Sequence, residues 1–268
     1  MGGMNEDVIT IGLLDDDDIA LDKAALALSA LDHDGIDIDP YLALLEEIDD
    51  RLAVVGRDAK DPLAQAEALS RVFYQEFGFE GDAESYDAPL NADLIRVLDR
   101  RRGLPVSLSI LYVAAARRMG WTAHALNTPG HVLVRIGDEE AVLVDPFHGG
   151  LDVTPARLET LLQGALGPGV RPEAEHFAAM SNRMVLVRLL LNQASRAERD
   201  GDPLRALTLY ERMTTAAPEN PDGWWELARL QLQLHDSDSA RGSLSAMLEI
   251  TRDPERRQLV SAALEALA

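Results

Sequence analysis

The sequence predicts an α+β domain with a small antiparallel sheet, followed by an all-α helical repeat. Apolar residues recur at helical spacing through the first hundred residues, short segments between residues 122 and 144 have strand character, and no strand pattern remains after about residue 184. The expected boundaries are 1–180 for the α+β domain and 184–268 for the repeat. With 268 residues and 47% hydrophobic content, the chain is long enough to give each unit its own core.

Five helices are expected in the first domain. The fifth helix is expected at 105–119, and Gly120 follows it as a residue typical of helix ends. Pro62 follows Asp61, which is the order of a capping residue and a first-turn proline. The segment 78–89 is polar and contains glycine, so a loop is expected there. The four helices before residue 102 are expected at 19–31, 40–55, 62–77 and 91–101.

Three short strands are expected after the fifth helix, at 122–126, 132–136 and 141–144. A turn at Gly137-Asp138-Glu139 joins the last two strands into a hairpin. Because the helices are separate in sequence from this small sheet, the pattern is that of an α+β domain.

The second domain has a 34-residue period. With Pro218 at the closing position of one unit, Gly201 falls at its turn and Ala206 at a small packing position, and Ala240 matches Ala206 one period later. Two repeat units are therefore expected, and 254–268 would cover the exposed face of the second. An ordinary helical bundle is the alternative.

The composition excludes several classes of function. The net charge of −21 and a pI near 4.5 argue against binding to nucleic acid, which needs clustered lysine and arginine. The chain contains no cysteine, so it has no disulfide and no thiol nucleophile. No stretch has the apolar length of a membrane span, and the acidic N-terminus is unlike a signal peptide. We therefore expect a cytoplasmic protein.

Two acidic segments near the N-terminus have both a functional and a structural interpretation. Asp15–Asp18 is either a site for a cation or basic partner, or a solvated segment before a helix; the solvated segment is favoured. Residues 32–39 resemble half of a calcium loop but lack the acidic residue at its twelfth position, so they are expected to be a linker.

A possible group of metal ligands was also considered, formed by His124, His131 and His148 with Asp145. Their spacing is not typical of a metal site. No metal ion or other cofactor is expected.

Three residues carry the candidate chemistry. Ser107 lies in the first turn of the expected helix 105–119, His131 follows Pro129-Gly130 at the start of a strand, and Asp145 ends the next strand. A serine hydroxyl is protonated at neutral pH and needs a base within hydrogen-bond reach to act as a nucleophile. The three residues are therefore a candidate nucleophile, base and orienting carboxylate. The alternative, which is favoured for Ser107, is a hydroxyl that packs or caps the helix start.

The candidate site requires a particular hairpin geometry. His131 and Asp145 are expected to be cross-strand partners, so that the numbers of paired residues sum to 276 and the loop has an odd length. A four-residue loop would place the two side chains on opposite faces of the sheet.

Three further residues are candidates for binding. Arg102, with the two arginines before it, would either bind an anion at the following helix start or pair with acidic residues of the N-terminal half. Trp224 and Trp225 are adjacent, so we expect only one of them to face the repeat core. The other would mark a peptide-binding groove or a contact with the first domain.

The motifs resemble a known family. The segments 98–112, 116–120, 129–135 and 144–150 are similar in sequence and order to the SirB-type family of bacterial transglutaminase-like proteins with C-terminal tetratricopeptide repeats. The resemblance covers nearly the whole chain and implies a transglutaminase-like, papain-like fold. It places His131 at the general-base position and Asp145 at the orienting carboxylate. The usual cysteine falls between Pro105 and Ser107, where this chain has no thiol. A related segment in an F-box protein implies use as an adaptor.

The expected function is noncatalytic protein binding or regulation by a pseudoenzyme that lacks the catalytic cysteine. A protein or peptide partner would bind the tetratricopeptide-like region. The alternative is a serine-dependent hydrolase or acyltransferase that uses Ser107, His131 and Asp145, and a third class is a purely structural scaffold. If the acyl-transfer frame persists, a cysteine introduced at position 107 is expected to be unusually reactive. The sequence does not predict an oligomeric state.

Overall fold

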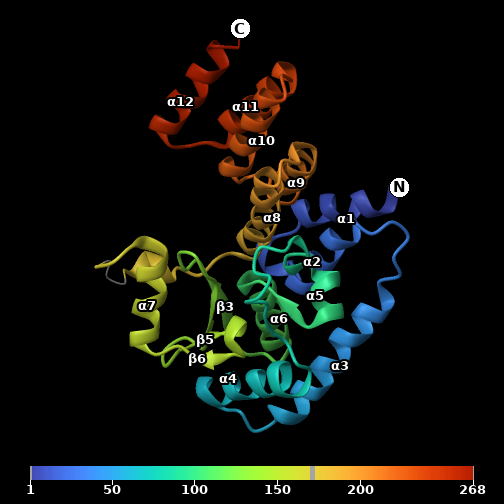
Figure 1. Ribbon diagram of the computed structural model, residues 1–268, viewed down its shortest axis with the longest axis vertical. Coiled ribbons are helices and arrows are strands. Elements are labelled where there is room, and N and C mark those ends of the chain that lie inside the picture. Colours follow the sequence, from blue (N-terminus) through green and yellow to red (C-terminus); the bar gives the residue numbers. More distant parts are fainter. Residues whose placement is uncertain (1, 170–172, 268) are drawn as a thin grey trace. The chain divides into compact units, whose positions relative to one another are not determined.

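A computed structural model of the protein describes residues 2–169 and 173–267 (Figure 1). Its contacts divide the chain into two compact units. The α+β unit is Asp16–Val185, and the repeat unit joins the residues up to Asp15 with Leu186–Ala268. The sequence-based boundaries differ mainly in the first fifteen residues, which were expected in the α+β domain.

All five helices expected in the α+β unit are present with slightly different ends. The helix expected at 62–77 continues beyond α4 as a π-helical turn, Arg71–Glu76. One further helix, α7, was not expected. The helices of this unit are α2 (Leu21–Ala30), α3 (Asp39–Val55), α4 (Pro62–Ser70), α5 (Leu94–Arg100), α6 (Pro105–Arg118) and α7 (Pro155–Leu166).

Local sequence explains where two of these helices begin and end. The side chain of Asp61 accepts a hydrogen bond from the backbone N–H of Ala64 at 2.9 Å, and thus caps α4 as the sequence indicated. Asp93 caps α5 in the same way through Arg96 N–H. α5 ends where Arg101 takes a left-handed conformation, with φ of 59°.

Helix α6 forms the centre of the core in the α+β unit. Every residue from Pro105 to Ala116 is buried, and the first charged residues are Arg117 and Arg118 in the last turn. A helix that is apolar on all sides is stable in water only when other elements surround it. α6 packs against α2, β3, β4 and the 3₁₀ turn Pro146–His148. It therefore fixes the position of the hairpin that carries the candidate site.

The main sheet is antiparallel and has the strand order β3-β4-β5-β6. Its strands are β3 (Ala123–Leu126), β4 (Leu133–Ile136), β5 (Val142–Asp145) and β6 (Leu151–Asp152). A second, parallel pair joins β1 (Glu80–Gly81) to β2 (Arg102–Gly103). From the sequence, the residues of β1 were expected in a loop, and β2 and β6 were not expected. Each of these three is only two residues long, too short for an alternating pattern.

The repeat unit is all-helical among its described residues. Its small packing positions behave as the 34-residue period predicted, because Ala206 and Ala240 are both fully buried. Its helices are α1 (Gly2–Leu13), most of α8 (Asn182–Arg199), α9 (Pro203–Ala216), α10 (Pro221–Gln233), α11 (Ser237–Ile250) and α12 (Pro254–Glu265).

Helix α1 belongs to the repeat unit because it packs against α9. Val8 and Ile11 of α1 are buried. A side chain at Gly12 would meet the backbone carbonyl of Thr215, so glycine allows the two helices to approach closely. This helix was not expected from the sequence.

Both tryptophans of α10 contact the repeat core, so the expectation that only one would do so is wrong. Trp224 and Trp225 are half-buried and pack against the same apolar cluster of Ala228, Leu244, Met247 and Val260. The indole N–H of Trp224 also donates to the carbonyl of Pro218 at 2.8 Å. The residues of this cluster come from α10, α11 and α12. Because three helices surround the cluster, two adjacent side chains of α10 can both contact it.

Within the α+β unit, an aspartate from the acidic N-terminal run caps a helix that begins 166 residues later. The two carboxylate oxygens of Asp16 accept the backbone N–H groups of Asn182 and Arg183, each at 2.8 Å, at the start of α8. The Asn182 side chain donates in turn to the Asp16 carbonyl at 2.7 Å. Asp16 thus has a structural role in addition to the solvated one expected for the run.

Replacing Asp16 with alanine is expected to lower the free energy of unfolding by about 1–2 kcal/mol, the usual cost of losing a helix cap. Urea denaturation followed by circular dichroism measures this loss. Asp18→Ala is the matched control, because Asp18 lies exposed in the same 3₁₀ turn. It should change stability by less than about 0.5 kcal/mol. Equal losses in the two variants would contradict the capping role.

No helix among the described residues combines the length and the apolar content needed to cross a membrane.

Candidate functional site

The β4–β5 hairpin brings His131 and Asp145 together. Nε2 of His131 lies 2.9 Å from Oδ1 of Asp145. His131 lies just before β4, and Asp145 is the last residue of β5. The contact that the motif spacing predicted is therefore present in the structure.

The strand register differs from the predicted one. Val134 pairs with Val144 and Ile136 with Val142, so paired numbers sum to 278 and not to 276. His131 and Asp145 are therefore not direct cross-strand partners. A shift of two residues leaves every side chain on its predicted face, because side chains alternate with a period of two. The connection between the paired residues Ile136 and Val142 has an odd length, as predicted.

Asp145 is the centre of the site. It has no exposed surface, and the backbone N–H of Phe147 donates to its Oδ1 at 3.1 Å. Nδ1 of His148 lies 2.7 Å from its Oδ2, and the guanidinium of Arg157 lies 3.6 Å from the same oxygen. Burial alone would raise the pKa of Asp145, but the hydrogen bonds and charges of His131 and His148 outweigh it, so the pKa is lowered. Asp145 is therefore a carboxylate at neutral pH.

The turn after β5 brings His148 back onto Asp145. Pro146 starts a 3₁₀ turn that ends at His148, and Gly149 and Gly150 follow with positive φ. The N–H of Gly150 donates to the carbonyl of Asp145 at 2.8 Å, which closes the turn. In the sequence, His148 was considered only among four residues without metal-site spacing, and its contact with Asp145 was not predicted. The Asp-Pro-Phe-His-Gly-Gly sequence carries the signal, because a turn with glycines behind it places residues i and i+3 side by side.

Aromatic rings form one wall of the site. The Phe147 ring lies edge-to-face with His131 at 5.9 Å and with Tyr86 at 5.7 Å between ring centroids. The same ring packs onto Gly81 of β1, where any side chain would collide with it. This wall was not expected from the sequence, since Tyr86 and Gly81 come from a segment expected to be a loop.

Ser107 does not complete a catalytic arrangement with His131. Its side chain is fully buried, and its hydroxyl donates to the backbone carbonyl of Asn91 at 2.8 Å. A hydroxyl has one proton to donate. In this structure the proton is directed to the carbonyl, so the contact is the structural one that was favoured for Ser107.

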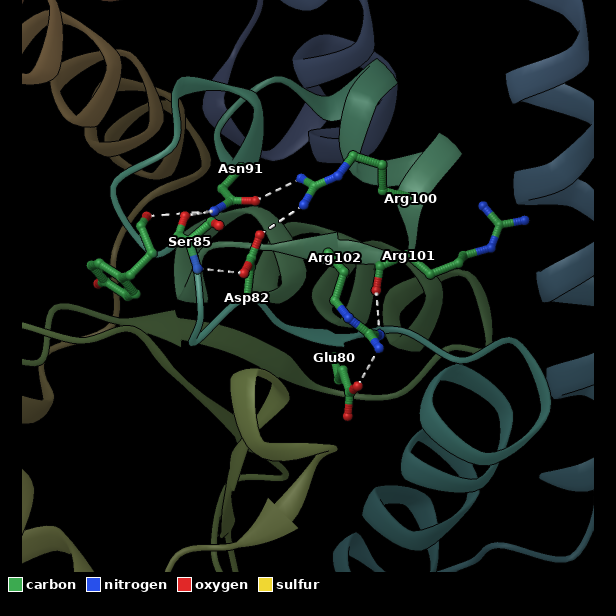
Figure 2. A network of polar contacts seen from close by, with 8 residues as sticks. Glu80, Asp82, Ser85, Asn91, Arg100, Arg101 and Arg102 are labelled. Carbon is green, nitrogen blue, oxygen red and sulfur yellow. Dashed lines mark hydrogen bonds and ion pairs between the residues drawn. The ribbon is translucent and has the colours of Figure 1, made fainter.

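Asn91 is the hub of the polar network beside the start of α6 (Figure 2). Its carbonyl accepts both Ser107 and the N–H of Leu104, the latter at 3.0 Å. Its side chain donates to the carbonyl of Ser85 at 2.6 Å and accepts from Arg100 at 2.8 Å. Arg100 in turn forms an ion pair with Asp82 at 2.7 Å. The region where the nucleophile was expected is therefore held by structural hydrogen bonds.

Arg102 is paired within the chain. Its guanidinium lies 2.5 Å from Glu80 (Figure 2). It also donates to the carbonyl of Gly78 at 3.1 Å. These contacts correspond to the pairing alternative, in which the arginines bind acidic residues of the N-terminal half. Binding of an external anion by Arg102 stays a prediction.

Three donor groups converge in a way that suits a metal ion. One nitrogen each from His131 and His148 and one oxygen of Asp145 lie within 4.8 Å of one another. His124 was the fourth residue considered in the sequence. It lies in β3 and is not part of this group.

A buried central helix packed against an antiparallel sheet that carries a His–Asp pair defines a transglutaminase-like domain, here followed by a helical repeat. Two family models agree with this class. The model of the transglutaminase-like superfamily matches residues 40–191, and a tetratricopeptide repeat model matches 197–264. The chain therefore belongs to the transglutaminase-like superfamily.

Several curated proteins are similar to this chain. A UPF0162 protein of Xylella fastidiosa (strain 9a5c) is 29% identical over 246 residues, which cover 90% of this chain and 87% of that protein. A UPF0162 protein of Vibrio cholerae is 31% identical over 76% of this chain and 73% of its own length. F-box only protein 21 of Mus musculus is 31% identical over 144 residues, 50% of this chain and 22% of that protein. The related F-box segment implied by the sequence resemblance is thus confirmed.

Proposed function

We propose that this protein is a noncatalytic protein-binding or regulatory protein of the SirB type, with a pseudo-transglutaminase domain and a partner-binding repeat. In sequence order, the pseudo-transglutaminase domain of the proposal is residues 1–180, although α1 packs in the repeat unit, and the partner-binding repeat is 184–268. The proposed location is the cytoplasm. The 34-residue helical repeat supports the binding role, because stacked repeats form extended surfaces for partners.

One observation carries the noncatalytic part of the proposal: Ser107 is fully buried and donates its proton to the carbonyl of Asn91. A serine nucleophile must instead give its proton to a base and reach its substrate. The chain also contains no cysteine to take its place.

A serine-dependent hydrolase or acyltransferase is the second candidate. The hydrogen bond between His131 and Asp145 favours it, because an orienting carboxylate is what a general-base histidine requires. In this alternative Ser107 would have to leave its contact with Asn91 before it could act.

Activity assays separate the two candidates. We expect the purified protein to hydrolyse activated acyl esters and to incorporate amines into glutamine peptides no faster than the Ser107→Ala and His131→Ala variants do. Rates for the three proteins should agree within about twofold, since removing a true catalytic residue lowers rates by orders of magnitude. Circular dichroism confirms that each variant is folded. A thousandfold loss in either folded variant would establish the alternative.

The binding role has its own test. Affinity capture with the tagged full chain from a native lysate should recover a protein that excess untagged chain displaces. The recovered protein, once purified, should bind the purified full chain directly in a calorimetric titration. If every displaced protein then fails to bind in the titration, the binding role is wrong.

A further inference from the structure

We propose that His131, Asp145 and His148 form a binding site for a divalent first-row transition-metal ion such as Zn²⁺. The inference does not depend on the proposed function, because it concerns ligand atoms and not the state of Ser107. Metal binding and acyl-transfer activity are also measured separately, so the failure of one proposal is distinguishable from the failure of the other.

The donor set has the right chemistry. Two imidazole nitrogens and one carboxylate oxygen are the protein ligands of many zinc sites that keep a further position open for water. The same combination binds other first-row divalent ions. The three donors come from the end of β5 and from the segments on either side of the hairpin strands, so the fold and not one flexible loop brings them together.

The geometry needs only a small adjustment. Nε2 of His131 and Nδ1 of His148 already point at the two oxygens of Asp145, at 2.9 and 2.7 Å. Ligand atoms about 2.0–2.2 Å from a tetrahedral ion lie roughly 3.3–3.6 Å apart. The three donors lie within 4.8 Å of one another, so an ion would replace the histidine–Asp145 hydrogen bonds, and these contacts would lengthen to make room for it. The exposed ring of His148 can make this movement, because 44% of its side chain is accessible.

Outer hydrogen bonds orient the ligands. The N–H of Phe147 holds Oδ1 of Asp145 at 3.1 Å, and the Phe147 ring lies edge-to-face against His131. A hydrogen bond to a ligating carboxylate fixes its orientation and is typical of metal sites. The accessible side of the group is formed by His148 and Arg157, which gives an ion a route from solvent.

Arg157 opposes the ion and supplies a diagnostic variant. Its guanidinium lies 3.6 Å from Oδ2 of Asp145, so it competes with a cation for the same carboxylate. Replacing it with glutamine removes a like charge near the ion. The affinity for Zn²⁺ should then increase by about tenfold, since charges a few ångströms apart near a protein surface interact by a few kcal/mol at most.

The test uses the full chain freed of metal with a chelator. Titration with ZnCl₂ at neutral pH should give one site with a dissociation constant in the micromolar range or below. Binding of Co²⁺ at the same site should produce visible absorption typical of nitrogen and oxygen ligands, and Zn²⁺ should abolish it. His131→Ala and His148→Ala should each weaken binding about 10- to 100-fold or more, because each removes one of three ligands.

His124→Ala is the matched control, because His124 lies in the same sheet but outside the group. It should leave the affinity unchanged. Since His148 is accessible, His148→Ala should fold normally, and circular dichroism verifies this. The proposal is overturned if the wild type binds Zn²⁺ with no dissociation constant below 1 mM, which corresponds to a binding free energy of about −4 kcal/mol. It is equally overturned if folded His148→Ala binds as tightly as the wild type.

Discussion

Replacing Gly150 with alanine is expected to lower the free energy of unfolding of the α+β unit by about 2–4 kcal/mol. Gly150 has φ of 72°, a left-handed conformation that costs alanine about 1 kcal/mol. An added Cβ would also lie 2.7 Å from the Tyr112 hydroxyl oxygen and 3.1 Å from Cβ of Ser70. Tyr112 is fully buried and stacks on Phe73 at 4.6 Å, so its ring has no room to move. Crowding of this kind adds about 1–3 kcal/mol.

Gly35→Ala separates the backbone cost from the steric cost. Gly35 lies in the same unit and has nearly the same φ, 70°, but no atom lies within 4 Å of its would-be Cβ. It should lose only the backbone contribution of about 1 kcal/mol. Urea denaturation of both variants gives the difference. If the two variants lose equal stability, the close packing of Gly150 against Tyr112 is wrong.

Helix α6 could be predicted from the sequence because its residue pattern is compatible only with a buried helix. An apolar run from Pro105 to Ala116, closed by two arginines and a glycine, is both long enough for a helix and too apolar for a surface. The shared face of His131 and Asp145 in the following hairpin could also be predicted. An odd number of residues in the hairpin loop is enough to place the two side chains on the same face of the sheet, whichever register the strands adopt.

The exact register was beyond the sequence. Sums of 276 and 278 place the same side chains on the same faces, so the hydrophobic pattern satisfies both. The structure selects 278, and the His131 contact then runs diagonally from the segment before β4 to the end of β5. Long side chains reach diagonal neighbours in a sheet, so His131 and Asp145 remain in contact despite the two-residue difference in register.

Contacts between distant segments account for most of what was missed. The hydrogen bonds of Asp16 to the start of α8 span 166 residues, and those of Asn91 to Ser107 span 16. No periodicity marks either pair. The contact between His148 and Asp145 was not predicted for a different reason: the two residues are three apart, and only the turn geometry after Pro146 makes that spacing a contact.

A cysteine placed at position 107 is expected to react with iodoacetamide at least about 10³-fold more slowly than an exposed thiol. Ser107 has no accessible surface, so a thiol there reacts only after local opening, and a thousandfold protection corresponds to an opening free energy of about 4 kcal/mol. Burial also raises the pKa of a thiol, which lowers its thiolate fraction. The burial of Ser107 thus predicts a slow reaction, which is the opposite of the fast reaction expected if the acyl-transfer frame were intact.

Ser239→Cys is the matched comparison, because Ser107 and Ser239 are each the third residue of a helix, α6 and α11 respectively. Ser239 is exposed, so the helix dipole acts on both thiols while access differs. The chain has no other cysteine, and mass spectrometry therefore follows one thiol in each variant. A thiol at 107 that reacts as fast as the one at 239, and that slows when His131 is replaced by alanine, would mean that Ser107 does reach the histidine. The noncatalytic proposal would then give way to the serine-dependent alternative, because the contact with Asn91 would be only one of two positions of the same side chain.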